Sequence, residues 1–167
     1  MAKSIKLVTG EARLSYLSVY EKTETLSGKL KYQASVIIPK SDKATIKAFN
    51  DAFDSLVADN QDIFKGVSPK LIKGRLRDGD EEKSTDEAYA NSMFFNCSSD
   101  YQPPIFGDDS LPLVGTVVSG DYGRVSVNAF VYNAGGSKGI GYGLNSIMKT
   151  RDGEKLGGSV ATAADFA

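Results

Sequence analysis

The segment YGRVSVNAFVY, residues 122–132, alternates between two kinds of side chain. Because successive side chains of a β-strand point to opposite faces, one face carries only small and β-branched residues, as a core face does. The other face carries aromatic, basic and amide groups. Aromatic rings stack on unpaired nucleic-acid bases, arginine contacts phosphate, and amides and hydroxyls hydrogen-bond to either. The residues of this second face are Tyr122, Arg124, Ser126, Asn128, Phe130 and Tyr132.

A strand buried on both sides is the alternative interpretation, in which the aromatic rings belong to the core. Arg124 and Asn128 argue against it, because a charged or polar group that is buried without a partner is costly. We therefore expect the second face to be exposed on the protein surface.

The composition indicates one globular domain. A chain of 167 residues can bury a core without disulfides, and its hydrophobic residues, 41% of the total, form no run near the roughly 20 that a membrane helix needs. The first residues lack the pattern of a signal peptide. We expect a cytoplasmic protein with no membrane partner.

Few catalytic chemistries are open to this chain. One cysteine, Cys97, and no histidine exclude disulfides, Cys-His zinc sites and histidine-dependent triads. Asp78, Asp80 and Glu82 alternate as in a cation loop, but Gly79 is not at the position that an EF-hand requires. We favour a solvated acidic loop folded against the neighbouring basic stretch. We expect no catalytic residue, no metal and no cofactor; a metal-dependent nuclease is the alternative.

The pattern of the chain predicts a small, highly curved β-barrel with one helix. We expect strands at 5–20, interrupted near Gly10, and at 31–38, 93–99, 122–132 and 139–149. An amphipathic helix at 42–58, capped by Ser41 or Asp42, is expected to pack on the core. Residues 60–92 are polar and irregular, with one short helix near 84–91. In the first strand, Ala12, Leu14 and Tyr16 alternate with Arg13 and Ser15.

The glycine-rich segment GGSKGIGYG lacks the phosphate-binding pattern GxxxxGK followed by serine or threonine, and no helical period follows it. We interpret it as a flexible hairpin whose Lys138 contacts a phosphate.

Several motifs together resemble a known family. They are RLSYLSVYE, IIPKSDKATIKAF, LRDGDEE, SGDYGRVSVNAFVYN, KGIGYGLNSIMKTRDGE and LGG, in that order over nearly the whole chain. The sequence resembles a family of bacteriophage single-stranded DNA-binding proteins, long catalogued as a domain of unknown function. The resemblance implies an OB-fold, a mainly β, five-stranded Greek-key barrel with one main α-helix and long loops.

The resemblance also implies a site and a division of the chain. Residues 1–150 would form the binding domain and residues 151–167 a flexible tail. In relatives a basic stretch follows the third strand, whereas this chain has Tyr101 there, which would replace charge with stacking. The residues expected to bind DNA are Arg13, Lys73, Arg75, Arg77, Phe94, Asn96, Tyr101, Tyr122, Arg124, Asn128, Phe130, Tyr132 and Lys138. Phe95 and Cys97 are expected to point inward.

The expected function is non-sequence-specific binding of single-stranded DNA in support of phage replication, recombination and repair, in the cytoplasm of the infected bacterial host. Asp165 and Phe166 suggest a weakly acidic tail that contacts replication or recombination proteins. The protein is expected to be a monomer or homodimer. The alternatives are the nuclease and a structural phage protein whose aromatic face binds another protein.

Overall fold

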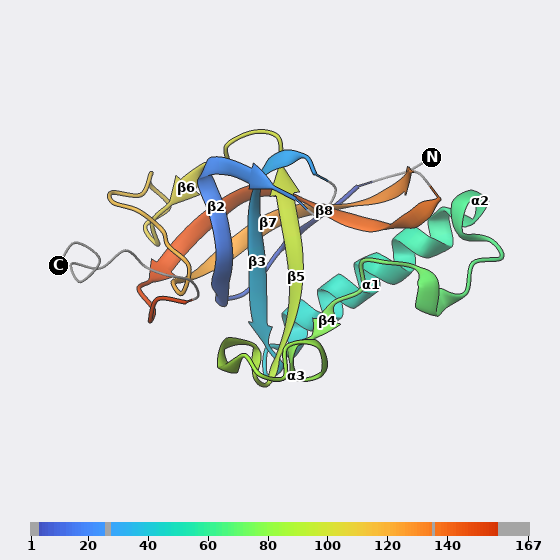
Figure 1. The fold of residues 1–167 in the computed structure, drawn as a ribbon, viewed down its shortest axis with the longest axis horizontal. Coiled ribbons are helices and arrows are strands. Elements are labelled where there is room, and N and C mark those ends of the chain that lie inside the picture. Colours follow the sequence, from blue (N-terminus) through green and yellow to red (C-terminus); the bar gives the residue numbers. More distant parts are fainter. Residues whose placement is uncertain (1–3, 26–27, 135, 157–167) are drawn as a thin grey trace.

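The computed structural model describes residues 4–25, 28–134 and 136–156, and Figure 1 shows their arrangement. The strands are β1 (Ile5–Val8), β2 (Ala12–Glu24), β3 (Leu30–Pro39), β4 (Arg77–Asp78), β5 (Ser92–Ser99), β6 (Ile105–Phe106), β7 (Tyr122–Ala134) and β8 (Ser137–Arg151). The α-helices are α1 (Lys43–Asp59), α2 (Gln61–Phe64) and α3 (Gly79–Glu82), and the 3-10 turns are Pro69–Leu71 and Glu87–Tyr89.

Five strands form a closed ring of hydrogen-bonded pairs. Strand β2 pairs with β3 and with β7, β3 pairs with β5, and β7 pairs with β8, all antiparallel. The ring closes through a parallel pair, β5 with β8, in which Ser98 lies opposite Gly143. The predicted mainly β fold with one main helix is confirmed, and this strand order is that of the expected five-stranded barrel.

The first strand is interrupted where the main helix approaches it. A Cβ atom at Gly10 would lie 2.5 Å from Oδ2 of Asp42. Asp42 caps α1 by accepting hydrogen bonds from the amide and the hydroxyl of Thr45, and the amide of Gly10 donates to that hydroxyl. The predicted interruption and the Asp42 cap are both confirmed, and they are parts of the same contact.

The apolar stripe of α1 packs on the core, as predicted. Phe49 and Phe53 are buried, and the ring of Phe49 lies 4.8 Å from that of Phe95 and 5.7 Å from that of Tyr142. The helix lies along the end of the barrel below the β7–β8 hairpin in Figure 1. Phe95 and Cys97 point into this core, as expected.

A β-bulge in β2 changes which side chains face inward. Ser15 pairs with Ser35 and Ser18 pairs with Gln33, so β2 contains one more residue than β3 across this interval. Ala12 and Leu14 are buried as expected, but Ser15 is buried too, and Tyr16 is 63% exposed. Strict alternation predicted Tyr16 on the same face as Ala12 and Leu14. This prediction is wrong, because the β-bulge changes the face to which the side chain points.

The acidic loop folds against basic side chains, as predicted. Lys40 forms ion pairs with Asp78 and Asp80 at 2.9 and 2.7 Å, and Arg77 pairs with Glu82 at 2.7 Å. The hydrogen bond from Lys40 is the main cause that lowers the pKa of the Asp78 carboxyl. The short helix expected near residues 84–91 is a 3-10 turn, Glu87–Tyr89.

Asp121 joins the segment that follows β8 to the barrel. Its buried carboxylate accepts hydrogen bonds from the amides of Val118 and Gly153, and Lys149 lies 3.2 Å away. Burial alone raises the pKa of this carboxyl, but these three donors outweigh burial, so the pKa is lowered. Of the predicted tail, residues 157–167 lie outside the described part of the chain.

The substitution Asp121→Asn should destabilise the protein by about 1–3 kcal/mol at pH 7, because an amide cannot replace the charged acceptor of three donors. A carboxyl with a lowered folded pKa stabilises above its unfolded pKa of about 3.9, and this contribution is lost as the pH falls through the folded value. Thermal denaturation from pH 7 to pH 2 should therefore show the two proteins converging at the acidic end. Asp152→Asn is the matched control, because Asp152 also pairs with Lys149 but is 88% exposed. An equal loss in both variants would contradict this role of Asp121.

Candidate nucleic-acid interface

A groove crosses the face formed by β5 and β8 and consists of two connected hollows. The larger, about 1030 Å³, reaches from Tyr16 on β2 to Phe130 on β7. The smaller, about 590 Å³, extends beneath the segment 72–82 to Tyr132. Arg77, Asn96, Gly141 and Tyr142 line both hollows, so the two form one continuous groove.

Two aromatic rings of β7 lie over glycines of β8. Phe130 pairs with Gly141 and Tyr132 pairs with Gly139. A Cβ atom at Gly141 would lie 2.7 Å from Cζ of Phe130, and one at Gly139 would lie 2.9 Å from the hydroxyl of Tyr132. At Gly141 the ring of Phe130 is the close neighbour, whereas at Gly139 a Cβ atom would also lie 2.6 Å from the carbonyl oxygen of Lys73, so glycine there admits both the Lys73 backbone and Tyr132. The segment interpreted as a flexible hairpin does lie in the β7–β8 hairpin: Gly136 is in the turn, and from Ser137 onward the segment is the paired strand β8.

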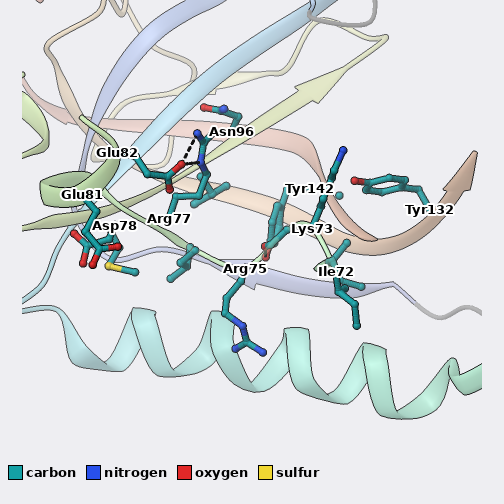
Figure 2. A pocket seen from close by; sticks show the side chains of 16 residues that line it. Ile72, Lys73, Arg75, Arg77, Asp78, Glu81, Glu82, Asn96, Tyr132 and Tyr142 are labelled. Carbon is teal, nitrogen blue, oxygen red and sulfur yellow. Dashed lines mark hydrogen bonds and ion pairs between the residues drawn. The ribbon is translucent and has the colours of Figure 1, made fainter. Parts of the chain in front are cut away.

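Tyr132 and Lys73 form one end of the groove. Figure 2 shows both side chains beside the β7–β8 hairpin, with Asn96 farther along the smaller hollow. Lys73 is held there by its backbone, because the amide of Ile140 donates to its carbonyl at 2.8 Å. Within the described part of the chain, no carboxylate lies within ion-pair distance of the Lys73 ammonium group. This lysine is therefore available to an incoming anion.

The two arginines of the basic segment already have carboxylate partners. Arg77 pairs with Glu82 and lies 4.8 Å from the ring centre of Phe94. Arg75 pairs with Asp54 at 2.9 Å and covers the ring of Phe53, so it points toward α1, as Figure 2 shows. Both are exposed, and a phosphate would compete with a carboxylate for each of them.

Tyr142 supports the base of the groove and holds its wall. Its hydroxyl donates to the carbonyl of Gly74 at 2.6 Å, which ties the segment 72–77 to β8. Burial raises the pKa of this tyrosine to about 12. Gly74 has a φ of +110°, and a Cβ atom there would lie 2.1 Å from the carbonyl oxygen of Ile140, so only glycine permits this approach.

Phe94 is not an exposed stacking residue, and that expectation is corrected. It points to the opposite face from Phe95, as predicted, but it is only 1% exposed. The ring of Tyr89 packs against it edge-on at 5.0 Å, and Arg77 covers it. The 3-10 turn that carries Tyr89 comes from the irregular region, which is why the alternation of β5 could not reveal this burial.

Three of the predicted residues lie at the other end of β7, away from the groove. The ring centre of Tyr122 lies 5.5 Å from the guanidinium carbon of Arg13 and 3.7 Å from that of Arg151. Arg13 donates to the carbonyls of Gly120 and Glu154. These contacts give Arg13 and Tyr122 partners within the fold.

Arg124 belongs to the same end, since its Nε donates to the carbonyl of Thr9. Asn128 lies between the two ends and donates to the side chain of Asn145. The second face of β7 is therefore divided, and only Phe130 and Tyr132 reach the groove.

Two further predicted residues lie outside the lining of the groove. Tyr101 is 83% exposed in the loop after β5. Lys138 donates to the carbonyl of Ile63 at 3.0 Å, which ties the β7–β8 hairpin to α2.

Sequence reasoning missed Tyr16 and Lys83, which line the larger hollow. The alternating pattern of the sequence does not reveal the β-bulge that exposes Tyr16.

Comparison with known structures places this fold among phage proteins that bind single-stranded DNA. The single-stranded DNA-binding protein of bacteriophage Enc34, in complex with single-stranded DNA, matches with a TM-score of 0.74 and 17% identity, over 91% of this chain and 89% of that one. A second structure of the Enc34 protein matches with a TM-score of 0.72 and 17% identity, over 96% of this chain and 89% of that one. The single-stranded DNA-binding protein gp2.5 of bacteriophage T7 matches with a TM-score of 0.60 and 13% identity, over 100% and 96%.

The closed barrel is thus a fold shared with one class of protein, the phage single-stranded DNA-binding proteins. The model of the Enterobacter phage Enc34 single-stranded DNA-binding protein family matches residues 5–167, and the chain belongs to that family. A search of curated proteins gave no significant match. The resemblance seen in the sequence is confirmed.

Proposed function

We propose that the protein binds single-stranded DNA without marked sequence preference, with the strand lying in the groove. The observation that carries the proposal is the pair of rings, Phe130 and Tyr132, seated on Gly141 and Gly139 beside an open hollow. Residues two apart on a strand are about 6.6 Å apart, roughly twice the 3.4 Å rise between stacked bases of a duplex. Only an extended, unstacked strand can place successive bases on both rings.

Charge in the groove supports phosphate binding despite a net charge of −1. Lys73 is free of carboxylates in the described residues, whereas Arg77 would exchange Glu82 for a phosphate. Asn96 offers an exposed amide to either bases or backbone. Stacking supplies affinity that does not depend on sequence, and the cations supply a salt-dependent part.

We place this activity in phage DNA replication, recombination and repair, in the cytoplasm of the infected bacterial host. Membership of the Enc34 family supports the setting. Among the described residues, none of the helices has the length and apolar character to cross a membrane. Asp165 and Phe166 are proposed to contact replication or recombination proteins, and the protein is proposed to act as a monomer or homodimer.

Fluorescence anisotropy with labelled oligo-dT and a duplex of the same length tests the function. We expect tight binding to the single strand only, which weakens as salt rises from 50 to about 200 mM. The assay contains no magnesium, and an intact oligonucleotide after incubation with magnesium would exclude the nuclease alternative. Equal affinity for the duplex, or no binding to either, would contradict the proposal.

Two glycines of β8 allow a test that leaves every charge and ring in place. Gly141→Ala puts a methyl group 2.7 Å from Cζ of Phe130, so the ring must shift from its position over Gly141, and we expect affinity for oligo-dT to fall at least fivefold. Gly143→Ala is the matched control, because its Cβ atom would lie 3.8 Å or more from its neighbours. Phe130→Ala should weaken binding at least as much as Gly141→Ala. Similar affinities for both glycine variants would show that the Phe130 ring in its position over Gly141 does not contribute to DNA binding.

The Arg77–Glu82 pair predicts a change in salt dependence. Glu82→Gln frees Arg77 for phosphate, so binding should tighten at low salt and the slope of log K against log salt should steepen by about 0.7. Asp51→Asn is the control, since it removes the same charge from an exposed pair with Lys47 outside the groove lining. Parallel slopes for wild type and Glu82→Gln would mean that Arg77 does not reach phosphate.

A further inference from the structure

Tyr16 has an unusual backbone for its position. It lies at the β2 bulge with a φ of +46°, in the left-handed region that a bulky residue adopts only at an energetic cost. The bulge turns its side chain outward, and the tyrosine is 63% exposed. Burial therefore does not explain why a large aromatic side chain occupies this strained site.

A cation is held over the exposed ring. The ammonium group of Lys83 lies 5.6 Å from the ring centre of Tyr16 and 5.6 Å from that of Tyr89. Lys83 follows α3, and its amide donates to the carbonyl of Gly79. The ion pairs of Lys40 with Asp78 and Asp80 fix this segment to the end of β3. Two separate parts of the chain thus bring a ring and a cation together.

Tyr16 and Phe130 line the same hollow from different strands. The hollow of about 1030 Å³ extends from Tyr16 and Lys83 across β3 and β5 to Phe130 and Gly141. Polar side chains, Ser98 and Gln33 among them, also line this hollow. A DNA strand that continues from Phe130 along this hollow therefore reaches a second aromatic ring, Tyr16, beside the ammonium group of Lys83.

We propose that Tyr16 is a third stacking residue for single-stranded DNA, at the opposite end of the groove from Tyr132, and that Lys83 contacts the phosphate of the stacked nucleotide. This inference rests on the proposed function. The strain at Tyr16 is retained because the left-handed backbone aims the ring into the groove. The two ends together define the path of the strand, from Tyr132 over Phe130 to Tyr16.

Three substitutions of Tyr16 separate stacking from stability. Tyr16→Phe keeps the ring, Tyr16→Leu keeps bulk without it, and Tyr16→Gly removes both and relieves the positive φ. We expect Tyr16→Phe to bind a long oligo-dT as wild type does, and the other two to bind about 5- to 100-fold more weakly. The melting temperature of Tyr16→Gly should equal or exceed that of the wild type, which a merely structural role would not allow.

Lys83→Gln tests the phosphate contact. We expect it to lower the slope of log K against log salt by about 0.7, while Tyr16→Leu leaves that slope unchanged.

Wild-type affinity in both Tyr16→Leu and Tyr16→Gly would overturn the inference while the proposed function stands. A wild-type protein that fails to bind oligo-dT would instead remove the proposed function itself. A loss in Tyr16→Phe equal to that in Tyr16→Leu would also overturn stacking, because the ring is retained.

Discussion

The register of β7 against β8 is the constraint on which the groove depends. It sets Phe130 opposite Gly141 and Tyr132 opposite Gly139, where a Cβ atom on β8 would lie 2.7 Å from the Phe130 ring and 2.9 Å from the Tyr132 hydroxyl. The same pairing places the inward side chains Val125 and Val127 in the core. A shift of one residue would reverse both faces of β7, so burial of the core and presentation of the rings are fixed together.

The wall of the groove depends on the same strand. The carbonyl of Gly74 accepts from Tyr142, and the backbone of Lys73 pairs with Ile140, so the segment 72–77 runs along β8. The next part of the chain is fixed through Lys40 and its two aspartates at the end of β3. The irregular region between the second and third strands of the ring is thus attached at two points, and its basic residues follow the groove. Lys73, Arg75 and Arg77 line this wall together with Asp78, Glu81 and Glu82, and of the three bases only Lys73 has no carboxylate partner among the described residues.

Much of the fold could be predicted from the sequence because local patterns specify it. The alternation in residues 122–132, the apolar stripe of α1 and the cap at Asp42 each depend on neighbours in sequence. Phe130, Tyr132, Asn96 and Lys73 were expected in the site and do line the groove. The prediction failed where distant segments meet. Phe94 is covered by Tyr89 from another segment, and the bulge at Tyr16 depends on pairing with β3.

The central claim is that single-stranded DNA lies across β5 and β8, over the seated rings. The most direct measurement is a titration of isotope-labelled protein with oligo-dT, followed through its backbone amide resonances. The claim predicts the largest shifts at Asn96, Ser98 and Gly141, with little change around Arg13 and Tyr122 at the other end of β7. Shifts confined to the Arg13 and Tyr122 end, with the amides of β5 and β8 unmoved, would contradict it.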